Sequence, residues 1–147
     1  MITTEEIAVV AHNMLQESNV AGMISGQIDY ERNDYTKEDV ILVPHRITGE
    51  GSVRYGQVNV NIHVPDLVKK TGNSQPVYVK NFPRLIAIRK AVIDVLKSHY
   101  ESGEGWNWTI GALDPPIKEP GKNEHFVSLA LEITVREKKV INNLIGE

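Results

Sequence analysis

The most regular pattern in the chain is an alternation of apolar and polar side chains over residues 55–66. Valine or isoleucine takes every second position from 58 to 64, and Gln57, Asn59, Asn61 and His63 stand between them. A period of two is typical of a β-strand with one buried face. A merely solvated face would more often carry lysine, glutamate and threonine than amides and an imidazole. The polar face of this strand is therefore the first candidate for a function.

Two segments show the 3.6-residue period of amphipathic helices. In the first, residues 4–18, Thr3 and Glu6 have the spacing of a capping box ahead of the apolar positions. The second begins at Asn81 and Pro83, which are start signals for a helix. Its apolar stripe consists of Leu85, Ile88, Val92, Val95 and Leu96. Both helices are expected to bury one face against a sheet.

Other segments read as strands. Residues 39–48 are rich in β-branched residues, and the glycine-containing turn at 49–56 joins them to the alternating strand in a predicted β-hairpin. Residues 106–111 and 125–135 also alternate and predict two more strands. Residues 24–30 are expected to add a short one.

The order of these elements predicts the fold class. Residues 66–80 and the proline-rich residues 112–124 are predicted to be long loops. We expect an α+β fold in which a largely antiparallel β-sheet of about four to five strands is packed on one face by two helices, in a single domain over residues 1–136. Residues 137–147 have apolar side chains at helical spacing that this sheet does not need, so they are expected to form a tail that docks on a partner.

Composition narrows the function classes. The chain has 147 residues, a formal net charge of -3 and no cysteine. The charge gives no electrostatic reason to expect general binding to nucleic acids or membranes. Without cysteine there is no disulfide, no thiolate metal site and no cysteine nucleophile. With neither a basic, apolar leader at its start nor a long apolar stretch, the chain is expected to be soluble and cytoplasmic.

Catalytic signatures are missing from the sequence. The five histidines form no HxH or HExxH pair, and no serine lies in a GxSxG context. The glycine-rich residues 49–52 lie between two predicted strands, so they lack the helix N-terminus that would hold a phosphate. No metal, cofactor or catalytic residue is therefore predicted, and the protein is expected not to be an enzyme.

One enzymatic alternative stays open. Pro65 and Asp66, with Glu132, Glu137 and Lys139, superficially match the PD…(D/E)xK pattern of metal-dependent nucleases. In those sites the carboxylates lie on neighbouring strands of a short meander, whereas here a loop, a helix and a strand intervene. The purely structural interpretation is that Asp66 ends a strand and caps the following turn.

A second alternative is a small nucleic-acid-binding module. Trp106 and Trp108 share one parity of a strand and could stack on bases, with Lys69 and Lys70 contacting phosphates. An aromatic pair beside an apolar hairpin is more often part of a core. The core interpretation is favoured.

Four phrases of the sequence together resemble a known family. They are VILVPHRIT, GQVNVNIHVPD, RLIAIRKAVIDVLKS and FVSLALEITVRE, which follow the amphipathic N-terminal helix in that order. Over residues 4–136 this arrangement is similar to the tail-terminator or tail-completion (minor tail) proteins of long-tailed bacteriophages and prophages. The resemblance rests on pattern and order of elements, with no diagnostic motif.

The resemblance implies a structural, non-enzymatic component of the virion. Proteins of this family form a six-subunit ring that caps the tail tube and joins it to the head-tail connector. The expected partners are other copies of the chain, the tail tube and the connector, with assembly in the bacterial cytoplasm and a final place in the virion. Another neck or head-completion protein remains an alternative.

Within this interpretation the polar strand face gains a role. Amide side chains are wettable in a free protomer and can hydrogen-bond a neighbour in a ring. Gln57, Asn59, Asn61 and His63 are therefore predicted to line either the subunit contact or the channel. The loops at 48–56 and 111–124 are predicted to touch the tail tube or the connector. Their contact candidates are Arg54, Tyr55, Lys118 and Lys122.

Overall fold

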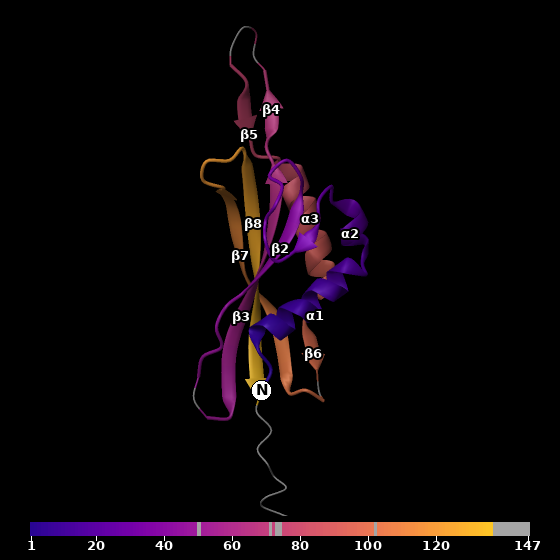
Figure 1. Ribbon diagram of the computed structural model, residues 1–147, viewed down its shortest axis with the longest axis vertical. Helices are drawn as coiled ribbons and strands as arrows, with labels where there is room; N and C mark the ends of the chain where they lie inside the picture. Colours follow the sequence, from indigo (N-terminus) through magenta and orange to yellow (C-terminus); the bar gives the residue numbers. More distant parts are fainter. Residues whose placement is uncertain (50, 71, 73–74, 102, 137–147) are drawn as a thin grey trace, which may run out of the picture.

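The structure is a computed structural model that describes residues 1–49, 51–70, 72, 75–101 and 103–136, and it is an elongated body built around a twisted sheet (Figure 1). In chain order the elements are α1 (Thr4–Gln16), α2 (Asn19–Met23), β1 (Ile28–Asp29), β2 (Asp39–Pro44), β3 (Val53–Pro65), β4 (Leu67–Lys69), β5 (Val77–Val79), α3 (Phe82–Leu96), β6 (His99–Glu101), β7 (Trp106–Lys118) and β8 (Glu124–Arg136). None of the helices in these described ranges is long and apolar enough to cross a membrane.

Six strands form the main sheet, in the order β1-β2-β3-β8-β7-β6, and β4 and β5 form a separate two-stranded sheet. β1 runs parallel to β2, and the other neighbouring pairs are antiparallel. β3 and β8 are paired from Val53 opposite Arg136 to Pro65 opposite Glu124. The predicted α+β class and largely antiparallel sheet are confirmed. The strand number exceeds the expected four to five because the short strand β6, which was not predicted, extends one edge of the sheet.

The N-terminal helix starts as its sequence predicts and ends earlier. The Thr3 side chain accepts a hydrogen bond from the Glu6 N–H, and the Glu6 carboxylate accepts one from the Thr3 N–H, which completes the capping box. α1 ends at Gln16 because Ser18 Oγ accepts a hydrogen bond from the Val20 N–H at 3.1 Å and so caps the separate short helix α2.

The second predicted helix is confirmed as α3. The Asn81 side chain caps it by accepting a hydrogen bond from the Arg84 N–H at 3.4 Å, and Pro83 lies in the first turn, where a missing N–H costs nothing. The helix stops at Leu96 because Lys97 adopts a positive φ of 43°. Its buried side chains are Leu85, Ile88, Val92 and Leu96.

The helices and one face of the sheet enclose a single core. Alternate side chains of β3 and β8 pack there with the buried faces of α1 and α3. Trp106 and Trp108 lie in this core, where the Trp108 Nε1–H donates a hydrogen bond to the Lys97 carbonyl at 2.9 Å. The core interpretation of the two tryptophans is confirmed, and they cannot form a base-stacking platform.

Two predicted loops contain strands instead. Within residues 66–80, Leu67–Lys69 and Val77–Val79 pair as the β4–β5 hairpin, because their β-branched and aromatic residues favour strands. Residues 112–124 are in large part a continuation of β7, which runs to Lys118. Two register shifts, between Ile110 and Leu113 and between Asp114 and Ile117, let the prolines lie within this strand.

Other boundaries also moved. The predicted strand at 39–48 ends at Pro44, and the predicted strand at 24–30 shrinks to two residues. A single domain over residues 1–136 stays a prediction, and one hydrophobic core runs through the described part of that range. The predicted docking tail at 137–147 lies outside the described residues.

Candidate functional site

The candidate site is the face of the main sheet opposite the helices, which we call the open face. On β3 the side chains of Val58, Val60, Ile62 and Val64 are buried in the core, so the alternating polar side chains point to the opposite face as predicted. Gln57, Asn59 and Asn61 are each half-buried there.

The strand register shows what lies beside these amides. Gln57 is opposite Glu132 on β8, whereas Asn59 and Asn61 are opposite the small residues Ala130 and Ser128. Small neighbours leave room for the amide groups to lie along the sheet. Gly111 on β7 likewise leaves room for the Glu132 carboxylate, which would lie 2.2 Å from a Cβ placed on that glycine.

The amides are only partly satisfied within the chain. The Gln57 Nε2 group donates a hydrogen bond to Asn59 Oδ1 at 2.5 Å. Asn61 Oδ1 is buried and has no hydrogen-bond partner among the described residues. A buried acceptor without a donor costs about 1–3 kcal/mol.

Few charges interrupt the open face. Of the side chains that β3 and β8 place on it over 55–61 and 128–134, only Glu132 is charged. Tyr55 on β3 and Tyr100 on β6 are 59% and 66% exposed. Their sheet partners Thr134 and Asn107 continue the same row of residues across the sheet. A surface of amides and hydroxyls with few charges and with exposed tyrosines has the composition of an interface core.

His63 differs from the other three residues of the predicted set. It is only 7% exposed, its Nδ1 lies 3.1 Å from Glu124 Oε1, and its ring stacks on Phe126 with ring centroids 4.9 Å apart. Because the protomer itself occupies this imidazole, His63 cannot line a subunit contact or a channel. The predicted contact strip is therefore corrected to Gln57, Asn59 and Asn61.

Arg32 buries this end of the open face. The segment between β1 and β2 brings its guanidinium against two carboxylates, those of Asp39 and Glu124, and it forms ion pairs with both. Arg32 Nε also donates to Glu124 Oε1 at 3.3 Å, and the Gln27 N–H donates to Asp39 Oδ1 at 2.7 Å. All four side chains of this buried network, Arg32, Asp39, His63 and Glu124, are at most 9% exposed.

The network shifts the protonation of its members. Burial raises the pKa of Glu124, but hydrogen bonds to His63 and Arg32 outweigh this and hold its pKa below the ordinary value. Burial likewise lowers the pKa of Arg32, and its hydrogen bonds to Glu124 and Asp39 reverse the effect and raise it. The network is thus built to keep Glu124 and Arg32 charged.

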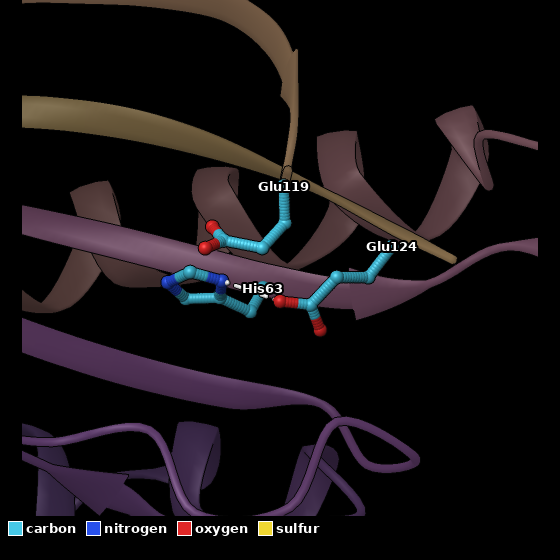
Figure 2. Close-up of side chains that lie close together, drawn as sticks. All are labelled: His63, Glu119 and Glu124. Carbon is cyan, nitrogen blue, oxygen red and sulfur yellow. Dashed lines mark hydrogen bonds and ion pairs between the residues drawn. The ribbon is translucent and has the colours of Figure 1, made fainter. Parts of the chain in front are cut away.

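The same corner holds a set of side chains that could bind a metal ion. Figure 2 shows the Glu119 carboxylate beside the His63 ring, with Glu124 on the other side, and one donor atom of each lies within 4.8 Å of the others. Both oxygens of Glu124 are already hydrogen-bonded. Oε1 accepts from Arg32 Nε and contacts His63 Nδ1, and Oε2 accepts from a terminal nitrogen of Arg32. The guanidinium would also repel a cation at this point. The arrangement favours an internal ion-pair network over a metal centre.

The four partner-loop candidates lie at the two ends of the long β3–β8 pair. Arg54 and Tyr55 are near the end at Val53, and Lys118 and Lys122 flank the turn that leads into β8 at the other end. The Lys118 Nζ group donates to the Lys122 carbonyl at 2.6 Å, and Arg54 donates to the Gly49 carbonyl at 3.1 Å. Twelve residue steps along β3 separate its ends by about 40 Å, so the two loops face different neighbours.

The residues of the nuclease alternative are not brought together. Asp66 follows Pro65, which lies opposite Glu124, whereas Glu132 is eight residues further along β8, about 27 Å away. Asp66 is instead held by His125, whose Nδ1 lies 2.6 Å from Asp66 Oδ1. The other two residues of that pattern, Glu137 and Lys139, are outside the described residues.

Sequence patterns did not indicate the buried network. Its members come from four segments of the chain, and Arg32 and Glu124 are 92 positions apart. The only local signal is that β2 and β8 each begin with an acidic residue, Asp39 and Glu124, and both are buried.

Comparison with known proteins adds no relative. No protein-family model matches the chain, and the search of curated proteins gave no match either. The functional argument therefore depends on the surfaces just described.

Proposed function

We propose that this chain is a structural protein of the phage or prophage tail-terminator type, which forms a ring, expected to be six-membered, between the tail tube and the head-tail connector. The observation that carries the proposal is the open face: a helix-free sheet surface with half-buried amides, one charged side chain among the β3 and β8 positions described above, and exposed tyrosines at its border. Such a surface is suited to contact another protein and ill suited to bind a polyanion.

The shape of the sheet supports a role between two partners. Because β3 and β8 are long, their two ends present separate groups, Arg54 and Tyr55 at one and Lys118 and Lys122 at the other. A terminator must touch the tube on one side and the connector on the other. The separation of about 40 Å along the strand gives one protomer the reach for both contacts.

The open face also suits the inside of a ring. Each protomer of a closed ring offers two different surfaces to its neighbours. Gln57, Asn59 and Asn61 are proposed to lie in this contact or to line the bore.

The test is the double variant N59D/N61D. It preserves side-chain shape and adds two negative charges to the strip, next to Glu132. We expect the parent to assemble into rings visible by electron microscopy and light scattering, and the variant to associate at least about tenfold more weakly because like charges oppose each other across the contact. Circular dichroism should show the same folded protomer in both.

The control is N13D/N19D, which makes the same chemical change at two exposed positions on α1 and α2, outside the open face and the predicted contact loops. It should assemble as the parent does. A parent that stays monomeric alone and in the presence of polymerised tail tubes would refute the proposed function. Rings formed equally well by N59D/N61D would instead remove the strip from the contact.

A further inference from the structure

The β4–β5 hairpin projects from one end of the body, away from the N-terminus (Figure 1). Its two strands pair only with each other, through Leu67 with Val79, Val68 with Tyr78, and Lys69 with Val77. A two-stranded hairpin standing alone in water is marginally stable at best. This hairpin therefore needs a surface to lie against.

Apolar side chains occupy both faces of the hairpin. Paired residues share a face, so Leu67, Val77 and Val79 point to one side and Val68 and Tyr78 to the other. Leu67, Val68, Val77 and Tyr78 are 45%, 52%, 50% and 44% exposed. A hairpin with one solvated face would carry polar residues there, so its composition indicates contacts on two sides.

The apolar surface continues onto the start of α3. Phe82 and Ile86 are both exposed, and their spacing of four residues places them on the same side of the helix. We call β4, β5, Lys70, Lys80, Phe82 and Ile86 the arm. Contiguous apolar surface of this kind marks an interaction site.

The charge of the arm narrows the choice of partner. Residues 67–80 contain Lys69, Lys70 and Lys80 and no acidic residue. Since the whole chain has a net charge of -3, the remainder carries -6. The arm is thus a basic, apolar projection on an acidic protein. Its positive charge is complementary to the negative charge of the rest of the chain.

An acidic surface that fits the arm lies between β1 and β2. Asp29, Glu31, Asp34 and Asp39 line a surface cavity of about 220 Å³ there, and Lys37 is the one basic side chain in its lining. Glu31 and Asp34 are exposed, and neither forms an ion pair with a described residue. The exposed rings of Tyr30 and Tyr35 lie in the same segment and offer apolar area. We call residues 29–37 the acidic segment.

We infer that the arm of one copy of this chain docks on the acidic segment of a second copy. The lysines of the arm would face Glu31 and Asp34, and its apolar side chains would cover the tyrosines. Such a contact joins two different surfaces, so repetition closes into a ring when the rotation between copies allows it. The inference rests on the proposed ring and adds the element that links its protomers.

Charge reversal tests this contact directly. K69E/K70E and E31K/D34K should each weaken self-association at least about tenfold, because each places like charges across the contact. The combined variant K69E/K70E/E31K/D34K restores opposite charges and should associate within about threefold of the parent. The control K90E/K97E reverses two exposed lysines, one on α3 and one directly after it, and should leave association unchanged.

Cross-linking distinguishes this inference from the proposed function. Carbodiimide joins a lysine to a carboxylate in direct contact, and a mixture of ¹⁵N-labelled and unlabelled copies identifies links between molecules. We expect links from Lys69 or Lys70 to Glu31 or Asp34 that combine both labels. Rings without these links, assembled equally well by K69E/K70E, would overturn the inference and leave the proposed function standing. Links found in open filaments would support the arm contact and refute the ring.

Discussion

The buried network around Arg32 offers the sharpest test of the fold. Replacing Arg32 by methionine keeps much of the side-chain length and apolar stem and removes the cation. Asp39 and Glu124 would then remain buried without the group that compensates them. The Arg32 side chain is 8% exposed and makes ion pairs to both carboxylates, so solvent cannot easily replace it.

The expected loss is large. Removing one partner of a buried ion pair costs about 3–5 kcal/mol, because an uncompensated charge stays in a poorly solvated site. Domains of this size unfold with a total of about 5–15 kcal/mol. With a urea m-value of about 2 kcal/mol/M, a loss of about 4 kcal/mol lowers the unfolding midpoint by about 2 M.

Urea titration followed by tryptophan fluorescence measures this change, since Trp106 and Trp108 lie in the core. The matched control is R84M, which breaks the more exposed pair of Arg84 with Glu38 and should cost about 1 kcal/mol. Adding E124Q to R32M should recover part of the loss, because one of the stranded charges is gone. A loss for R32M no larger than that for R84M would refute the account of a buried, mutually compensated network.

Two further predictions follow from single residues. The pKa of Glu124 is held below its ordinary value, so its charged form stabilises the fold at neutral pH. This stability is lost as the pH falls below about 4. The urea midpoint of E124Q should therefore vary less than that of the parent between pH 7 and pH 3. Gly105 has a φ of 73°, and a Cβ placed on it would lie 2.7 Å from the Arg136 carbonyl oxygen, so G105A should destabilise the protein by about 2 kcal/mol or more. The control is G51A, at a φ of 79° with open space around the Cβ position. It should cost about 1 kcal/mol in the same titration.

Local patterns predicted the parts of the fold that local physics determines. The alternation around Val58 and Val60 correctly separated the buried from the open face of β3, because strand geometry sends neighbouring side chains to opposite sides. The capping box at Thr3 and the cap at Asn81 located the starts of both long helices, because a cap satisfies N–H groups within a few residues of itself.

The missed parts depend on contacts between distant segments. Proline at 115 and 116 argued for a loop, yet β7 passes through both, because register shifts let an outer strand absorb residues without an N–H. His63 has the same sequence pattern as Asn61. It is buried because Glu124 and Phe126 of β8 lie against its ring and Arg32, from the segment between β1 and β2, pairs with Glu124, and none of these contacts can be read from the pattern of β3.

The segment between β1 and β2 connects the network with the arm contact. Its Arg32 side chain points inward to Asp39 and Glu124, while Glu31 and Asp34 on either side of it remain exposed. The ion pairs of Arg32 thus attach this segment to the body, and its carboxylates Glu31 and Asp34 point to solvent. Because a docking surface binds more tightly when it is held in place before the partner arrives, the ion pairs of Arg32 would order the acidic segment for the arm of a second copy. In the proposed assembly, loss of the buried Arg32 charge in one protomer would therefore weaken its contact with the next.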